Sequence, residues 1–187
     1  KKFPSVEVKI EDPDEEGVGE LMAKGPSIML GYYENEEATK SALESDGWFH
    51  TGDLARIDKD GFIYISGRKK SVIVLNNGKN VFPEEIETLL NKVEGIKETF
   101  VFEKKEDDGD VKVCVEIVYD KELIKDLYHI EGEENIKEFL WNKVKEVNKL
   151  MPKYKYVREM VITEEPLIKT TTLKIKRHEE LKKVLGK

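Results

Sequence analysis

Chemically useful side chains of this sequence gather in three short polar stretches, and the first contains Asp53. It follows Thr51 and Gly52. A single carboxylate in such a turn can accept hydrogen bonds from both hydroxyls of a ribose, while the glycine lets a ligand approach the backbone and Thr51 offers a hydroxyl group. Taken alone, however, this tripeptide is also typical of an ordinary turn aspartate between two strands.

The second stretch begins at Gly67 and contains Arg68 and Lys70. A guanidinium has a fixed fork of donors that can reach ribose hydroxyls or a carboxylate; a surface salt bridge would explain Arg68 equally well. A rotating joint between domains needs one or two residues at the end of an element that absorb the change in backbone dihedrals, and Lys70 is placed for that role. The alternative for Lys70 is an ordinary exposed lysine.

A glycine turn follows, in which Asn77 and Gly78 precede Lys79. The same letters describe a plain Asn-Gly turn in front of a helix and a loop that could approach a ligand.

The third stretch, residues 166–177, contains Lys174 among other cations and no acidic residue. When ATP activates a carboxylate, negative charge accumulates on phosphate oxygens, and a positioned ammonium stabilises it. The alternative interpretation is a basic, solvated tail.

The elements that must position these side chains change in character near residue 68. Before it we expect short strands and turns with one helix: strands over 5–10, 19–22, 27–30, 54–57 and 62–65, and a helix over 36–43 capped by Asn35. After it we expect a strand over 72–75, a helix starting at Pro83, an antiparallel pair over 96–102 and 111–118, a helix over 133–150, a strand over 157–162 and a final helix from about His178.

These elements predict an α+β chain in two parts. Residues 1–67 would be the short β-rich end of a large N-terminal domain, 68–70 a hinge, and 71–187 a small mobile C-terminal domain with antiparallel strands and flanking helices. Strand alternation starts at once, in Val6, Val8 and Ile10, so we expect a piece of a longer protein.

Composition excludes several classes of function. The net charge of -7 argues against nucleic acid and anionic lipid as partners, and no apolar run approaches the roughly 20 residues that span a bilayer. The three histidines lie far apart without ligand spacing, so we predict no metal site. The single cysteine, Cys114, lies in an apolar run and is expected to be a small buried hydrophobe. A reducing, cytoplasmic location is the natural expectation.

Taken together, four motifs occur in the order found in adenylate-forming acyl-CoA synthetases. They are Trp48–Asp53 (WFHTGD), Gly67–Ile73 (GRKKSVI), Asn77–Glu87 (NGKNVFPEEIE) and Pro166–Arg177 (PLIKTTTLKIKR). The chain resembles the C-terminal portion of these enzymes, and specifically the long-chain fatty acid–CoA ligase type. It departs from many members of the family at Leu173, where they carry glycine.

The resemblance assigns a role to each polar stretch. It implies nucleotide contacts for Asp53, Arg68 and Thr51, with Asp53 on the AMP ribose, a hinge at Lys70, CoA contacts for Gly78 and Lys79, and catalysis of adenylate formation by Lys174. It reads the glutamates after Pro83 as structural residues of the helix start.

The resemblance also implies the ligands: ATP or AMP, CoA, a carboxylate such as a fatty acid, and Mg²⁺ held mainly by the missing N-terminal domain of the same chain. The piece alone would then be inactive. Two alternatives stay open, an adenylation domain that loads a carrier protein and a non-catalytic interaction module of the same fold.

Overall fold

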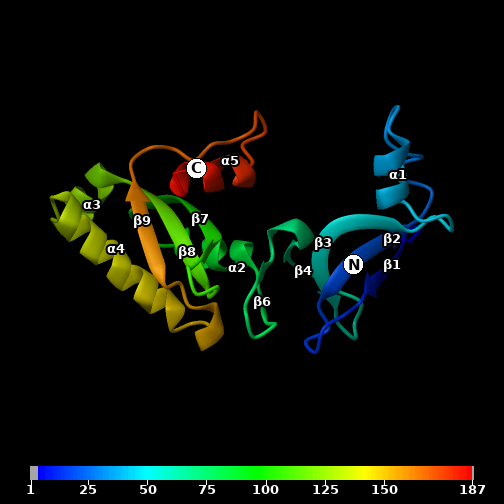
Figure 1. Ribbon diagram of the computed structural model, residues 1–187, viewed down its shortest axis with the longest axis horizontal. Helices are drawn as coiled ribbons and strands as arrows, with labels where there is room; N and C mark the ends of the chain where they lie inside the picture. The colour runs from blue at the N-terminus through cyan, green and yellow to red at the C-terminus, as the bar shows by residue number, and fades with distance from the viewer. Residues whose placement is uncertain (1–3, 187) are drawn as a thin grey trace. The chain divides into compact units, whose positions relative to one another are not determined.

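The computed structural model describes residues 4–186, which form two compact units. The first unit ends at Val72, two residues after Lys70, and the second begins at Ile73 (Figure 1). Each unit has its own sheet and its own buried side chains. Rotation of one unit about Lys70 stays a prediction.

The first unit is a four-stranded antiparallel sheet with one short helix. Its strands follow each other in the order β1 (Glu7–Glu11), β2 (Gly19–Lys24), β3 (Phe49–Ile57) and β4 (Ile63–Arg68), and its helix is α1 (Glu36–Ala42). Asn35 caps α1 by accepting a hydrogen bond from the Ala38 amide at 2.9 Å, as expected. The hairpin of β3 and β4 is also confirmed, whereas the strand expected over 27–30 is wrong. A turn closed by the Ile28 amide and the Gly25 carbonyl occupies that place, because Gly25-Pro26 bends the chain.

The second unit is the mixed α+β part. Its main sheet has the strand order β7 (Ile96–Lys105), β8 (Val111–Tyr119) and β9 (Glu159–Thr163), and a small ribbon pairs β5 (Ile73–Val74) with β6 (Asn80–Val81). The helices are α2 (Pro83–Leu90), α3 (Lys121–Tyr128), α4 (Glu133–Asn148) and α5 (Arg177–Val184), with 3-10 turns at Lys69–Ser71, in the first unit, and Lys153–Lys155. The expected fold class is confirmed.

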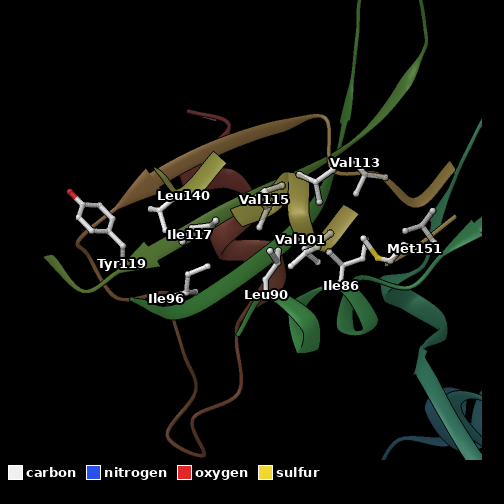
Figure 2. Close-up of a cluster of buried hydrophobic side chains, with 14 of the residues drawn as sticks. Ile86, Leu90, Ile96, Val101, Val113, Val115, Ile117, Tyr119, Leu140 and Met151 are labelled. Atoms are coloured by element: carbon white, nitrogen blue, oxygen red, sulfur yellow. The ribbon is translucent and has the colours of Figure 1, made fainter. Parts of the chain in front are cut away.

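Alternation along β8 builds two layers of core. Val113, Val115 and Ile117 face the cluster shown in Figure 2, where they meet Ile86 of α2 and Leu140 of α4. On the other face, the residues of a second cluster pack under α5: Phe100, Phe102, Cys114, Val118 and Leu167, with Leu181 and Val184 against them. Figure 1 shows α4 and α5 on opposite sides of this sheet. Successive strand side chains point to opposite faces, so one buried strand supplies both layers.

Two features of the second unit were not predicted from sequence. Helix α3 was missed because Ile124 is its only buried residue, too short a stripe to recognise. Strand β9 pairs parallel to β8 rather than antiparallel, and this direction depends on where the chain leaves the long helix α4.

Cys114 is buried as expected, and burial raises the pKa of its thiol to about 11.

The buried amide of Asn148 fixes the return from α4 to β9. Its Oδ1 accepts a hydrogen bond from the Val157 amide at 3.0 Å, and its Nδ2 donates to the Val157 carbonyl at 3.1 Å. The side chain therefore satisfies both backbone groups of Val157, as a neighbouring strand would. Buried backbone groups need such partners, since each unsatisfied group costs about 1–3 kcal/mol.

We expect Asn148→Leu to lower the free energy of unfolding of the second unit by at least about 2 kcal/mol, because both backbone groups of Val157 lose their partner. Urea unfolding followed by Trp141 fluorescence, in a Trp48→Phe background, measures this. The control is Asn142→Leu, at an exposed position of the same helix, which should change stability by no more than about 0.5 kcal/mol. Equal effects of both substitutions would contradict the proposed role of Asn148.

Candidate functional site

The structure brings Thr51, Asp53 and Arg68 together at one end of the β3–β4 pair. Asp53 and Arg68 are direct partners in the strand register. Arg68 Nη1 donates to Asp53 Oδ1 and also to the Thr51 carbonyl oxygen, the latter at 3.2 Å. The Asp53 side chain is still 32% exposed, so it retains acceptor capacity for the hydroxyl groups of a ligand.

A bulge of strand β3 at Gly52, rather than a turn between strands, shapes this carboxylate site, because the pairing register between β2 and β3 shifts there. Gly52 has a φ of +71°, a conformation that favours glycine, and a Cβ there would lie 3.6 Å from the Arg68 guanidinium. The Thr51 hydroxyl donates to the Leu21 carbonyl at 2.7 Å and accepts from the Asp53 amide at 3.1 Å. Thr51 thus supports the bulge, and a nucleotide contact by its hydroxyl stays a prediction.

Sequence reasoning missed Glu20, which lies buried beside the same bulge at 7% exposure. Its Oε1 accepts from the Gly52 amide at 3.2 Å, while Oε2 accepts from Lys69 Nζ at 2.8 Å and lies 3.1 Å from His50 Nδ1. Burial acts to raise the pKa of Glu20, but the hydrogen bonds from Lys69 and His50 hold it below its ordinary value. The signal available in the sequence was an acid at an inward position of an alternating strand, between Val18 and Met22.

The turn that contains Gly78 and Lys79 connects β5 to β6. The Gly78 amide donates to the Leu75 carbonyl at 2.8 Å, and the Lys79 amide donates to Asn77 Oδ1 at 3.0 Å. Gly78 has a φ of +77° with open space around it, so the turn geometry rather than crowding requires glycine. Lys79 Nζ lies 4.5 Å from the centre of the Tyr154 ring.

A cavity of about 590 Å³ opens beside this turn. Its wall combines two cations, Lys112 and Arg158, with the rings of Tyr154 and Tyr156. The remaining lining residues are Leu75, Asn76, Asn77, Asp110, Val111 and Val113. The combination of flat rings and cations is suited to a ligand that contains both an apolar surface and phosphate groups.

Lys174 lies on a short hairpin in front of α5. The Thr170 amide donates to the Lys174 carbonyl at 2.8 Å, and the Lys176 amide donates to the Ile168 carbonyl at 2.8 Å. At the tip, Thr170 Oγ1 accepts from the Lys174 amide at 3.2 Å. The Lys174 side chain is exposed, and among residues 73–186 no carboxylate forms an ion pair with its ammonium group.

Leu173 occupies the position where a glycine was expected from the family resemblance. Its φ of +61° lies in the left-handed region, which costs a residue with a Cβ about 1–2 kcal/mol. The side chain is 78% exposed, so no packing compensates this strain. The hydrogen bonds across the hairpin therefore hold Leu173 in this conformation.

Two carboxylates fix the base of the hairpin. Glu98 of β7 accepts from the Leu167 amide at 3.3 Å and pairs with Lys169. Glu180 of α5 is completely buried and accepts from the Ile168 amide. The hairpin is thus attached both to the sheet and to the helix that follows it.

An unpredicted acidic cluster lies beneath this attachment. Glu116, on β8, is only 3% exposed, and Lys183 Nζ lies 3.8 Å from its Oε1 and 3.1 Å from Glu180 Oε1. Burial, and then the negative charge of Glu180, raise the pKa of Glu116 to about 7. The sequence signal was a glutamate inside the apolar run of β8.

Comparison with known protein families assigns most of this chain to one family. Residues 70–184 match the pattern described as the AMP-binding enzyme C-terminal domain. The chain belongs to this family. The match includes Lys70, the turn at Gly78 and the hairpin that contains Lys174, whereas Asp53 and Arg68 lie before it.

Part of the chain is similar in sequence to curated ligases. The chain is 47% identical over 87 residues to a long-chain-fatty-acid–CoA ligase of Gallus gallus, covering 46% of this chain and 11% of that protein. It is 45% identical over 100 residues to the long-chain-fatty-acid–CoA ligase of Salmonella typhimurium, covering 51% and 18%. The matches therefore span less than a fifth of the length of these two relatives.

Solved structures share the fold over nearly the whole chain. ATP-bound MatB from Rhodopseudomonas palustris is 26% identical with a TM-score of 0.74, and covers 99% of this chain and 35% of its own. O-succinylbenzoate coenzyme A synthetase from Bacillus subtilis, in complex with ATP and magnesium ion, is 26% identical with a TM-score of 0.75, covering 97% and 35%. In this chain the AMP-binding enzyme C-terminal domain thus follows a β-rich part, which those solved structures also contain.

In the described part of the chain, residues 4–186, no helix has both the length and the apolar character required to cross a bilayer. Over the same residues, no group of three or more histidine, cysteine, aspartate or glutamate side chains could hold a metal ion.

The acidic cluster predicts a pH-dependent stability for the second unit. Between the ordinary glutamate value of 4.5 and about 7, folded Glu116 keeps its proton while the unfolded chain releases it. Stability therefore falls as pH rises through this window, by up to about 1.4 kcal/mol per pH unit, and the loss is complete above it. We expect Glu116→Gln to remove this part of the decline and to be more stable than the wild type at pH 8.

Urea unfolding at pH 5.5 and pH 8, followed by Trp141 fluorescence in the Trp48→Phe background, measures the difference. Glu165→Gln is the matched control, because Glu165 is exposed and lies 3.8 Å from the same Lys183 Nζ. A pH dependence that is the same for wild type and Glu116→Gln would show that Glu116 is ionised in the fold.

Proposed function

We propose that the chain is the C-terminal part of an ATP-dependent acyl-CoA synthetase. The parent enzyme would join a carboxylate to AMP, releasing pyrophosphate, and then transfer the acyl group to CoA. The observation that carries this proposal is the exposed ammonium of Lys174, which has no carboxylate partner among residues 73–186, on a hairpin that is fixed at its base. Membership of the AMP-binding enzyme C-terminal domain family supports it.

Lys174 would act in the first step. As the carboxylate oxygen attacks the α-phosphorus of ATP, negative charge grows on the phosphate oxygens and on the departing pyrophosphate. A positioned ammonium stabilises that charge more in the transition state than in the ground state. An ammonium already paired with a carboxylate would be much less effective, so the absence of such a partner in residues 73–186 fits the role.

Asp53 and Arg68 would hold the nucleotide. The half-exposed carboxylate can accept both ribose hydroxyls on the side not occupied by Arg68, and the guanidinium keeps the carboxylate oriented. Mg²⁺ accompanies ATP in this chemistry and neutralises phosphate charge. Residues 4–186 contain no group of three or more histidine, cysteine, aspartate or glutamate side chains that could hold this ion, so we assign it mainly to the N-terminal domain of the parent enzyme.

The turn at Gly78 and Lys79 would serve the second step. CoA carries phosphates and an adenine ring, and the cavity beside this turn presents Arg158 together with tyrosine rings. Lys112 in the same wall is paired with Glu159 and Glu106. Lys70 precedes the second unit and would let the hairpin and this turn act in succession.

A long-chain fatty acid is the carboxylate that we propose, because the relatives named above carry that activity in their names. A 2-succinylbenzoate–CoA ligase of Listeria monocytogenes is 42% identical over 113 residues, covering 60% of this chain and 22% of that protein, and its name indicates a different carboxylate. We further propose a cytoplasmic protein, and a 187-residue piece that is inactive alone. Loading of a carrier protein and a purely interacting module remain the competing functions.

We expect Lys174→Ala in the full-length enzyme to lower the rate of adenylate formation about 100- to 1000-fold, the usual effect of removing one charge-stabilising group. Thioester formation from a supplied acyl-adenylate should stay within about threefold, because in that step AMP rather than pyrophosphate leaves, and the turn at Gly78 and Lys79 rather than the Lys174 hairpin is proposed to serve it. Pyrophosphate exchange and single-turnover thioester assays measure the two half reactions. Lys176→Ala is the control, since this neighbouring lysine makes only an exposed pair with Glu179.

Equal loss of both half reactions in Lys174→Ala would reject the assignment. Wild-type enzyme that exchanges no pyrophosphate with any carboxylate would favour the interaction module. Adenylate formation without any transfer to CoA would favour carrier-protein loading.

We expect Asp53→Ala to weaken AMP binding about 10- to 100-fold, because two hydrogen bonds to a charged acceptor are lost. Titration calorimetry of the full-length enzyme measures the dissociation constant. Asp60→Ala changes an exposed aspartate in the turn of the same hairpin and should leave AMP binding unaltered. Unchanged affinity in Asp53→Ala would remove this carboxylate from the nucleotide site.

A further inference from the structure

The first residue of α5 forms a two-pronged ion pair with α2. Arg177 Nη2 donates to Glu87 Oε1 at 3.0 Å, and Nη1 donates to Glu87 Oε2 at 3.3 Å. Glu87 is only 8% exposed, and the guanidinium carbon lies 5.0 Å from the centre of the Phe100 ring. This planar, doubly bonded arrangement is specific to arginine.

The same pair covers the free edge of the main sheet at Val101. Strand β7 is an edge strand, so the outward backbone groups of Val101 have no strand partner. Glu87 Oε1 accepts from the Val101 amide at 2.8 Å, and Arg177 Nη2 donates to the Val101 carbonyl at 2.8 Å. Four groups thus form a closed network, and each side chain satisfies one backbone group as well as its partner.

Because Glu87 is buried, its carboxylate depends on the charge of Arg177, and the network is expected to form as a whole or not at all. Burial raises the pKa of Glu87, whereas the charge and hydrogen bonds of Arg177 and the hydrogen bond from Val101 oppose the rise. A buried carboxylate without its cation is strongly unfavourable. The pair is therefore expected to hold α5 and α2 at one fixed separation.

The ion pair joins the two segments to which the preceding section assigns chemistry. Glu87 belongs to the helix that begins directly after the ribbon containing Gly78, and Arg177 stands three residues after Lys174. Of the two residues between, Ile175 packs on the second cluster and the Lys176 amide is bonded across the hairpin. The position of Arg177 therefore limits where the Lys174 backbone can lie.

We propose that Arg177 is a positioning residue, which acts through Glu87 to hold the Lys174 hairpin at a fixed place on the domain. The inference rests on the proposed function in naming Lys174 as the group that is positioned. A lysine at position 177 could reach one carboxylate oxygen, but it could not bond both oxygens and the Val101 carbonyl together. Charge alone is thus insufficient for this role.

The first experiment is Arg177→Lys in the full-length enzyme. We expect the kcat of adenylate formation to fall about 10- to 100-fold while the KM for ATP changes less than about threefold. Thioester formation from supplied acyl-adenylate should stay within about threefold. Lys176→Ala, the neighbouring cation with a solvent-exposed pair, is the control and should leave all three values near wild type.

Hydrogen exchange provides a readout that does not depend on activity. In Arg177→Lys the hydrogen-bonded hairpin amides of Leu173, Lys174 and Lys176 should exchange at least about fivefold faster, while the amides of Val115 and Ile117 in the central strand keep their protection. Unchanged exchange in the hairpin would overturn the inference. Faster exchange throughout the domain would also overturn it, because Arg177 would then be a general stabiliser.

A double-variant comparison tests whether Arg177 acts through Glu87. Glu87→Gln keeps the shape of the side chain and removes its charge, and the variant Glu87→Gln/Arg177→Lys should lose no more adenylate formation than the more affected single variant. Losses that multiply would show that the two residues act independently and would overturn the inference. If the wild-type enzyme forms no adenylate, the proposed function fails, while hairpin exchange in both single variants still decides whether Arg177 positions this segment.

Discussion

Buried carboxylates that must find partners organise both units of this chain. A buried negative charge is tolerated only with a cation or with several hydrogen-bond donors around it. Glu20 accepts hydrogen bonds from the Gly52 amide and from Lys69, and Glu180 accepts one from the Ile168 amide. Glu87 closes the network with Arg177 and Val101. Each of these carboxylates contacts, or lies next to, a segment with a proposed chemical role. The partners that compensate its charge therefore also fix the position of that segment.

The loops themselves follow a common plan. Asp53 lies at a bulge of strand β3, and Lys174 lies on a hairpin whose base is attached to the sheet and to α5. This arrangement leaves both side chains accessible while their backbone stays fixed, which electrostatic stabilisation of a transition state would require. The second unit has two such loops on one α+β body, and one ion pair connects the elements beside them.

Local signals predicted much of the fold. The Asn35 cap, the Asn77-Gly78 turn and the start of α2 at Pro83 each depend on interactions within a few residues, so the sequence indicated them correctly. The strand expected over 27–30 was wrong because Gly25-Pro26 forms a turn that overrides apolar alternation. Helix α3 escaped notice because it buries a single residue, and the parallel pairing of β9 depends on contacts distant in sequence.

By itself the sequence determined which chemical groups this protein can present, namely a carboxylate at Asp53 after Thr51 and Gly52, a basic segment around Lys174 and a glycine turn at Gly78, because each is encoded in contiguous residues. Only the tertiary structure decided which groups lie behind them. Glu20 is more than thirty residues from Gly52 in sequence, and Glu87 is ninety residues from Arg177. Such partners meet through sheet register and helix packing. Burial then decides whether a glutamate is a solvated surface charge or a buried anchor, and burial is a property of the folded chain alone.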